Sequence, residues 1–260
     1  MTKVAQVTLW FWVMKICATT LGETAGDLLS MTLGVGYAVS SGILLGMFLV
    51  TLALQLAARR FHPVLFWLVI LSTSTAGTTM SDYLDRTVGL GYATGSLVLA
   101  SGLALALAAW RYSVGSLSVD HIGTPKAEAF YWVAILLSNT LGTALGDFLA
   151  DDSGLGFRGG AALIAGLLAL LVLAYRYTRL DRVLLFWSAF VLTRPFGATF
   201  GDLLTKPAAL GGLNLGTIGS SAVLATVLAL LVAYTSWAER RTIGRGIGAA
   251  DTAPRAPGAW

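Results

Sequence analysis

Long apolar stretches, separated by short polar segments, occupy most of this 260-residue chain. A helix needs about 20 predominantly apolar residues to cross a bilayer. Eight stretches have that length, at approximately 7–29, 37–58, 64–84, 92–112, 129–149, 158–178, 184–204 and 215–237. The pattern predicts an all-α, polytopic membrane protein with eight transmembrane helices.

The odd-numbered stretches carry a polar residue at about every fourth position. Residues four apart share one face of a helix, and a polar face is costly against lipid. We therefore expect the odd helices to line the interior of the bundle. The even helices should lie outside, since no charge occurs between Tyr37 and Ala58 or between Tyr92 and Trp110. The four stripes are Lys15, Thr19, Glu23 and Asp27; Ser74, Thr78, Asp82 and Arg86; Asn139, Thr143, Asp147 and Asp151; and Arg194, Ala198, Asp202 and Lys206.

A fourfold internal repeat underlies these stripes. In each unit a tryptophan is followed ten residues later by a glycine and fifteen residues later by an aspartate, and the second pair of units repeats the first at an offset of 120 residues. Two helices separate successive units, so all four enter the membrane in the same direction as parallel repeats. The expected organisation is a first half at 1–115, a linker at 116–128, a second half at 129–238 and a basic tail at 239–260. The tryptophan and aspartate pairs are Trp12 and Asp27, Trp67 and Asp82, Trp132 and Asp147, and Trp187 and Asp202.

These residues resemble a bacterial membrane family built from four tandem copies of a two-helix repeat of unknown function, each copy bearing a tryptophan. The resemblance runs from about Phe11 to Trp237. It implies eight helices in four related pairs, and it implies no activity.

The basic residues predict the orientation. Twelve Lys and Arg residues lie at the termini and in alternate loops, and three lie in the other loops, Arg86, Arg158 and Lys206. Such an excess marks the cytoplasmic side, so we expect both termini in the cytoplasm of a bacterial inner membrane. The basic rim also accounts for the pI of about 9.4, and nucleic-acid binding is not expected. Fifteen helical residues span about 22 Å, which places the tryptophans near the inner interface and the aspartates in the outer part of the membrane.

Two kinds of polar residue are candidates for a site. The first kind recurs, since each unit contains one of the four aspartates. The polar residues on the same helix faces are Thr19, Ser74, Thr78, Asn139 and Thr143. Lys15, Glu23 and Arg194 occur in single units, so the repeat does not require them, and Arg194 is an expected partner of Glu23 or of one of the aspartates. Pro195 predicts a kink or break in the seventh helix.

Simpler interpretations stand beside each of these. The tryptophans would serve as interfacial anchors or, alternatively, stack on a ligand. The aspartates would cap the following turns or line a ligand pathway. Lys15 and Arg194 would form structural ion pairs or act in gating.

The chemistry of the stripes favours a hard cation. Five carboxylates against Lys15 and Arg194 leave a formal charge of minus three within the membrane, and oxygen ligands suit Mn²⁺, Mg²⁺ or Na⁺. A first ligand set is Glu23, Asp27 and Asp147. The single cysteine and the loop residues His62 and His121 provide no cluster for a soft metal. No resident cofactor is expected beyond the transported cation.

We therefore expect a cation transporter of metal homeostasis. Its partners are the lipid bilayer, an inorganic cation and protons, since close carboxylates favour proton uptake and hence proton-coupled export. A cation channel is one alternative, and a structural or sensory membrane protein that does not transport is another. No enzyme motif is present, although two apposed carboxylates would suit aspartyl chemistry. The sequence leaves open the ion, the direction of transport and the oligomeric state.

Overall fold

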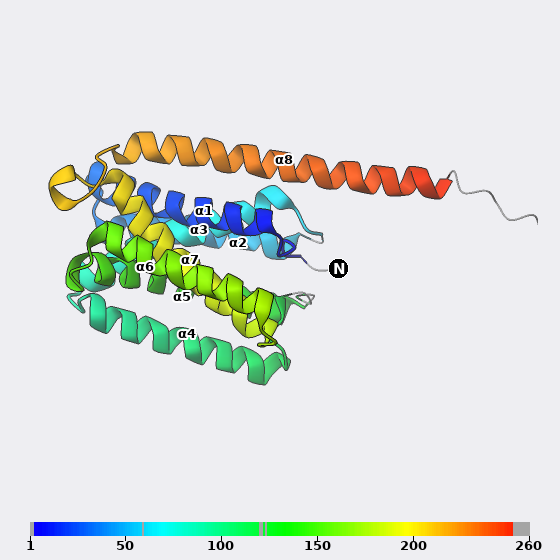
Figure 1. Ribbon diagram of the computed structural model, residues 1–260, viewed down its shortest axis with the longest axis horizontal. Coiled ribbons are helices and arrows are strands. Elements are labelled where there is room, and N and C mark those ends of the chain that lie inside the picture. Colours follow the sequence, from blue (N-terminus) through cyan, green and yellow to red (C-terminus); the bar gives the residue numbers. More distant parts are fainter. Residues whose placement is uncertain (1–2, 59, 120–121, 123, 252–260) are drawn as a thin grey trace, which may run out of the picture.

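Helices joined by short turns make up the computed structural model, which describes residues 3–58, 60–119, 122 and 124–251, with side chains to residue 238. Within these residues there are eight α-helices, so the all-α prediction is confirmed (Figure 1). They are α1 (Leu9–Asp27), α2 (Tyr37–Ala57), α3 (Pro63–Asp82), α4 (Tyr92–Val114), α5 (Pro125–Asp147), α6 (Gly156–Tyr177), α7 (Arg182–Thr205) and α8 (Thr217–Asp251).

Seven of these helices, α2 to α8, are long and apolar enough to cross a membrane. The remaining helix, α1, was also expected to span the membrane. It is less apolar than the other seven, because Lys15 and Glu23 lie within its 19 residues. It nevertheless runs inside the bundle, where its charged side chains are buried. The protein is thus a multi-pass membrane protein whose least apolar helix is shielded by its neighbours.

The odd helices form a closed ring. Helix α1 packs against α3, α3 against α5, α5 against α7, and α7 against α1. Each even helix packs mainly on the odd helix of the following repeat, so that α2 lies on α3, α4 on α5 and α6 on α7, and α8 closes the circle on α1. The two predicted halves are therefore joined on both sides into one body. Helix α1 begins and α8 ends at the same end of the bundle (Figure 1).

The outer position of the even helices is confirmed. In the spanning parts of α2, α4, α6 and α8, 17–28% of the residues are buried, against 50–72% in α3, α5 and α7. The polar stripes therefore face inward, as membrane energetics require.

Glycines bring the odd helices close together. The glycine ten residues after each tryptophan has no room for a Cβ atom, because it contacts the residue seven after the tryptophan of the next repeat in the ring. Small residues at such positions permit close helix approach. The four contacts are Gly22 with Ser74, Gly77 with Asn139, Gly142 with Arg194, and Gly197 with Thr19.

The helices end in a repeated way. In the first three repeats the α-helix ends on the aspartate and continues as a five-residue π-helical turn, at Leu28–Thr32, Tyr83–Thr87 and Phe148–Asp152. The glycine-rich turn then reverses the chain with positive φ angles, such as 82° at Gly36 and 70° at Gly91. The fourth repeat lacks the π-turn, since α7 stays α-helical to Thr205 and a short 3-10 turn, Ala208–Leu210, follows Pro207.

Two helix boundaries and the course of α7 differ from expectation. Helix α5 begins at Pro125, inside the predicted linker, because the Thr124 side chain caps it and Pro125 occupies its first turn. Helix α8 continues to Asp251, into the predicted tail, while residues 252–260 and His121 lie outside the described residues. Of the predicted kink or break at Pro195, the break is wrong, because α7 runs through Pro195 without interruption, and the kink stays a prediction.

Candidate functional site

Successive turns of the odd helices stack four-residue layers along the centre of the ring. The layer seven residues after the tryptophans holds Thr19, Ser74, Asn139 and Arg194, and the layer eleven residues after them holds Glu23, Thr78, Thr143 and Ala198. All eight side chains are buried. The predicted position of these residues on the inner face of the bundle is therefore confirmed, while a ligand pathway along them stays a prediction.

The aspartates form the next layer, at what we call the aspartate end of the bundle. Asp27, Asp82, Asp147 and Asp202 are 2–4% exposed. Asp27 and Asp147 cap neither the following turn nor the next helix with their side chains. The capping interpretation is wrong for them, because their carboxylates pair with cations instead.

The cations that pair with the four aspartates are Arg86 and Lys206, which were counted among the loop residues in the prediction of orientation. Arg86 Nε lies 3.1 Å from Asp82 Oδ1 and its Nη2 lies 3.4 Å from Asp147 Oδ2. Lys206 Nζ lies 2.7 Å from Asp27 Oδ2 and 3.2 Å from Asp202 Oδ1. We call Arg86 and Lys206 the rim cations. Each follows its own aspartate by four residues and also reaches the aspartate of the next repeat.

The neighbours of the rim cations stabilise their positive charge. Lys206 lies one residue beyond the spanning helix; burial lowers the pKa of its ammonium, but Asp202 and Asp27 outweigh burial and hold that pKa above its usual range. Arg86 is flanked by two aromatic rings, with its Cζ 5.8 Å from the Tyr37 ring centre and 5.6 Å from that of Tyr92. Both contacts are of the cation–π type.

Glu23 is the hub of the layer beneath the aspartates. Its Oε2 accepts hydrogen bonds from Arg194 Nη1 at 3.0 Å, Thr78 Oγ1 at 3.3 Å and Thr143 Oγ1 at 3.4 Å. Arg194 also donates to the Thr78 hydroxyl through Nη2. Of the expected partners of Arg194, Glu23 is confirmed. The hydrogen bonds to Glu23 join all four repeats, and the nonpolar Ala198 is the member of this layer that takes no part in them.

Lys15 lies deeper and apart from the carboxylates. Its Nζ donates to Asn139 Oδ1 at 3.2 Å and lies 4.1 Å from the centre of the Phe190 ring. Asn139 in turn donates to Thr73 Oγ1 at 2.9 Å. Lys15 thus shares no direct contact with Glu23, in agreement with their spacing along one helix.

An aromatic layer closes the opposite end, which we call the tryptophan end. The residue before each repeat tryptophan is also aromatic, and it contacts the tryptophan of the next repeat in the ring. Trp67, Trp132 and Trp187 are buried, so the interpretation as interfacial anchors is wrong for these three, whereas Trp12 is half-buried and keeps part of its ring accessible. The four ring-centre distances are 5.8 Å for Phe11 and Trp67, 5.7 Å for Phe66 and Trp132, 6.5 Å for Tyr131 and Trp187, and 5.8 Å for Phe186 and Trp12.

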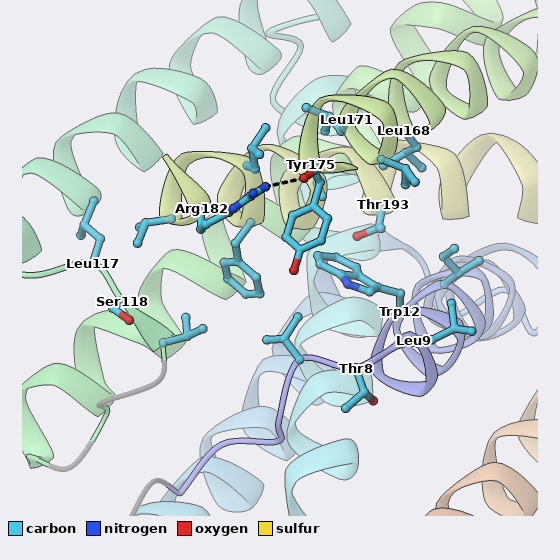
Figure 2. A pocket seen from close by; sticks show the side chains of 18 residues that line it. Thr8, Leu9, Trp12, Leu117, Ser118, Leu168, Leu171, Tyr175, Arg182 and Thr193 are labelled. Atoms are coloured by element: carbon cyan, nitrogen blue, oxygen red, sulfur yellow. Dashed lines mark hydrogen bonds between the residues drawn. The ribbon is translucent and has the colours of Figure 1, made fainter. Parts of the chain in front are cut away.

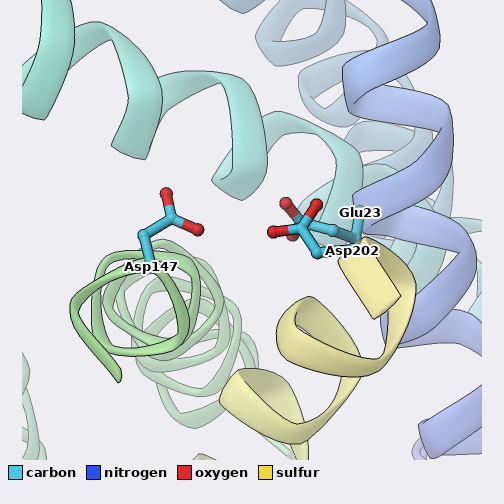
Figure 3. Close-up of side chains that lie close together, drawn as sticks. All are labelled: Glu23, Asp147 and Asp202. Atoms are coloured by element: carbon cyan, nitrogen blue, oxygen red, sulfur yellow. The ribbon is translucent and has the colours of Figure 1, made fainter. Parts of the chain in front are cut away.

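Three carboxylates converge between the aspartate and glutamate layers. One oxygen from each of Glu23, Asp147 and Asp202 lies within 4.8 Å of the other two, and all three residues are buried. Figure 3 shows Asp147 on α5 facing Glu23 and Asp202 from α1 and α7. We call these residues the carboxylate cluster. The cluster shares Glu23 and Asp147 with the predicted ligand set and differs from it in one member, since it contains Asp202 and not Asp27.

The Asp202 Oδ1 atom depends on Lys206. It is buried and lies 3.2 Å from Lys206 Nζ, but it accepts no hydrogen bond among the described residues. Buried carboxylate oxygens are normally hydrogen-bonded or bound to a cation. The Lys206 ammonium is therefore the group that compensates the charge of this oxygen.

The rim cations change the charge count. With Arg86 and Lys206 included, four cations face five carboxylates along the centre, so the predicted balance of minus three becomes minus one. The sequence contained a signal for this role, since Arg86 and Lys206 are 120 residues apart, as the two halves are. The aromatic residue before each tryptophan was an equally readable signal. Asp85 is also buried, and its Oδ2 accepts a hydrogen bond from the Ser81 hydroxyl. An aspartate at this position occurs in one repeat only, so the repeat pattern gave no indication of its burial.

A pocket of about 580 Å³ lies at the tryptophan end among α1, α6 and α7. Trp12 and Phe186 of the aromatic layer line it, and Arg182 at its edge donates to the Tyr175 carbonyl oxygen at 2.6 Å (Figure 2). The pocket includes no member of the carboxylate cluster. It is thus separate from the candidate site.

Comparison with known proteins agrees with the repeat architecture. Comparison with curated proteins and with solved structures gives no significant match. The family DUF347, described as a repeat of unknown function, matches four times in tandem, at residues 10–61, 65–116, 130–181 and 185–241. The chain therefore belongs to the DUF347 family, and its four repeats are the four sectors of the ring.

Proposed function

We propose that this chain transports a hard cation, such as Mn²⁺ or Mg²⁺, and that the carboxylate cluster binds it. The observation that carries the proposal is the convergence of Glu23, Asp147 and Asp202 from three repeats, with oxygens within 4.8 Å of one another. Carboxylate oxygens suit hard cations. The Thr78 and Thr143 hydroxyls beside Glu23 offer further oxygen ligands.

The filled centre of the ring favours a carrier over a channel. Below the cluster stand Arg194 and Lys15, both fully buried, and below them the aromatic layer. A conducting pore would need a continuous wet path through these layers. A carrier needs only to expose the cluster to one side at a time, and parallel repeats are known to rock against one another for that purpose.

Proton exchange is the proposed coupling. Carboxylates that release a metal ion in a poorly solvated site favour taking up protons in its place. The distribution of basic residues supports cytoplasmic termini in a bacterial inner membrane, with the cluster nearer the outer face. The proposed direction of transport is therefore export of the cation, driven by the entry of protons. The proposal includes no enzymatic activity.

Flux into proteoliposomes tests this function. Protein reconstituted with a Mn²⁺-sensitive dye inside the vesicles should admit Mn²⁺ under an opposing proton gradient. Glu23→Gln, Asp147→Asn and Asp202→Asn should each lose most of that flux. Asp152→Asn, an exposed carboxylate at the same end, should retain it. Asp82→Asn, which lies in the aspartate layer but outside the cluster, should lose less than Asp147→Asn.

The outcomes separate the alternatives. Native flux in all three cluster variants would remove the cluster from transport. Flux without counterflow by preloaded Mn²⁺ would indicate a channel. Folded protein that neither binds nor moves Mn²⁺, Mg²⁺ or Na⁺ would indicate a structural or sensory membrane protein.

A further inference from the structure

Each member of the carboxylate cluster is already paired with one cation of the protein. Glu23 pairs with Arg194, Asp147 with Arg86 and Asp202 with Lys206, at 3.0, 3.4 and 3.2 Å respectively. A divalent ion entering the cluster would come close to all three positive charges. In a poorly solvated site such repulsion is strong, so binding requires at least one pair to open.

The three cations differ in their access to water. The Arg194 side chain is fully buried, whereas the side chains of Arg86 and Lys206 are 30% and 19% exposed. Moving Arg194 away from Glu23 would leave both charges buried and unpaired, which is expensive. The rim cations can swing toward water at much lower cost, because their long side chains already reach the surface of the bundle.

The rim cations are also placed symmetrically. They occupy equivalent positions in the second and fourth repeats, where Arg86 spans the interface of α3 and α5 and Lys206 spans that of α7 and α1. The first and third repeats have Met31 and Asp151 at the same position. Cations therefore bridge two opposite interfaces of the ring, and the other two interfaces lack such a bridge among the described residues.

We propose that Arg86 and Lys206 are tethered counter-ions that compete with the transported cation for Asp147 and Asp202, so that their release opens the cluster. This inference rests on the proposed function and names the residues that govern cation entry. When both rim cations are docked, the groups along the centre sum to minus one; when both leave, they sum to minus three. The site is thus least attractive to cations while closed and most attractive once open.

Equilibrium binding of Mn²⁺ to the full-length protein in lipid nanodiscs tests the proposal. Lys206→Gln and Arg86→Gln should each tighten Mn²⁺ binding by about fivefold, the effect of losing one competing ion pair at the surface. Lys206→Arg and Arg86→Lys keep the charge and should bind with near-native affinity. Arg158→Gln removes an exposed charge at the same end and should leave the affinity unchanged.

Thermal unfolding provides a second readout. Without metal, Lys206→Gln leaves Asp27 and Asp202 unpaired and should melt below the native protein. Saturating Mn²⁺ should raise the melting temperature of Lys206→Gln more than that of the native protein, because the metal replaces the lost ammonium. A purely structural lysine would give a lower melting temperature that Mn²⁺ does not restore.

Failure of this inference is distinguishable from failure of the proposed function. Mn²⁺ binding that depends on Glu23 and Asp147 but is equal or weaker in both rim variants would overturn the competition and leave the transport site in place. Absence of Mn²⁺ binding to the native protein and to both rim variants would overturn both.

Discussion

Arg194 of α7 and Glu23 of α1 form a fully buried ion pair across the ring, with Nη1 3.0 Å from Oε2, although 171 residues separate them in the sequence. The pair lies directly below the aspartate layer and ties the last repeat to the first. Removal of either partner would leave an unpaired charge in a medium that solvates it poorly.

Arg194→Gln should destabilise the protein by about 3–5 kcal/mol, the usual result of breaking a buried pair. The double variant Glu23→Gln with Arg194→Gln should be more stable than Arg194→Gln alone, since no unpaired charge remains. Thermal unfolding in detergent measures both, with Arg158→Gln as the exposed control. Additive effects of the two substitutions would show that the pair is not coupled.

Gly197→Ala should destabilise the ring by about 1–3 kcal/mol through overpacking. A Cβ atom at Gly197 would lie 2.9 Å from the backbone carbon of Thr19, which cannot yield without moving α1. Gly42→Ala is the matched control, since nothing lies within 4 Å of a Cβ atom there. Equal melting temperatures for the two variants would contradict the close approach of α7 and α1.

Trp67→Ala should cost about 3–5 kcal/mol, because it leaves a cavity in the aromatic layer. Trp67 is 3% exposed, whereas Trp10 at the same end is 45% exposed. Trp10→Ala should therefore have a much smaller effect on the unfolding midpoint. A similar loss for both would mean that the repeat tryptophans act as interfacial anchors after all.

Labelling with a membrane-impermeant thiol reagent should report opposite sides for the two ends of the bundle. In a Cys17→Ala background, Arg158→Cys at the aspartate end should be labelled in intact cells. Arg179→Cys, in the exposed turn between α6 and α7, should react only after the cells are opened. The reverse result would invert the proposed orientation and place the cluster near the cytoplasm.

The helices and their inner faces could be predicted because both follow local rules. Apolar length identifies the spans, and a polar residue every four positions identifies the face that avoids lipid. Thr19, Ser74, Asn139 and Thr143 are accordingly buried where expected. Only α1 is less apolar than a spanning helix was expected to be. Its charged side chains are shielded by α3, α7 and α8, and that shielding is a property of the assembled bundle.

Which charged residues pair depends on the order of the helices around the ring, and the spacing of residues along the sequence does not predict that order. Asp27 was expected in the ligand set and Lys206 in a loop, yet the closure of α7 on α1 brings them within 2.7 Å. The tryptophans were misjudged for a related reason. An interfacial tryptophan and one buried between neighbouring repeats occupy the same depth, and the choice depends on which aromatic residue the adjacent helix presents.

The closure of the ring by α8 on α1 has a consequence for biosynthesis. A ribosome that has just completed α1 has produced a segment with an unpaired lysine and glutamate, and such a segment enters lipid poorly on its own. The acceptor for Lys15, Asn139, lies 124 residues further along the chain, and the partner of Glu23 lies 171 residues further. Helix α1 thus gains these two partners only after α5 and α7 have been made, so its stable insertion depends on helices that are translated much later.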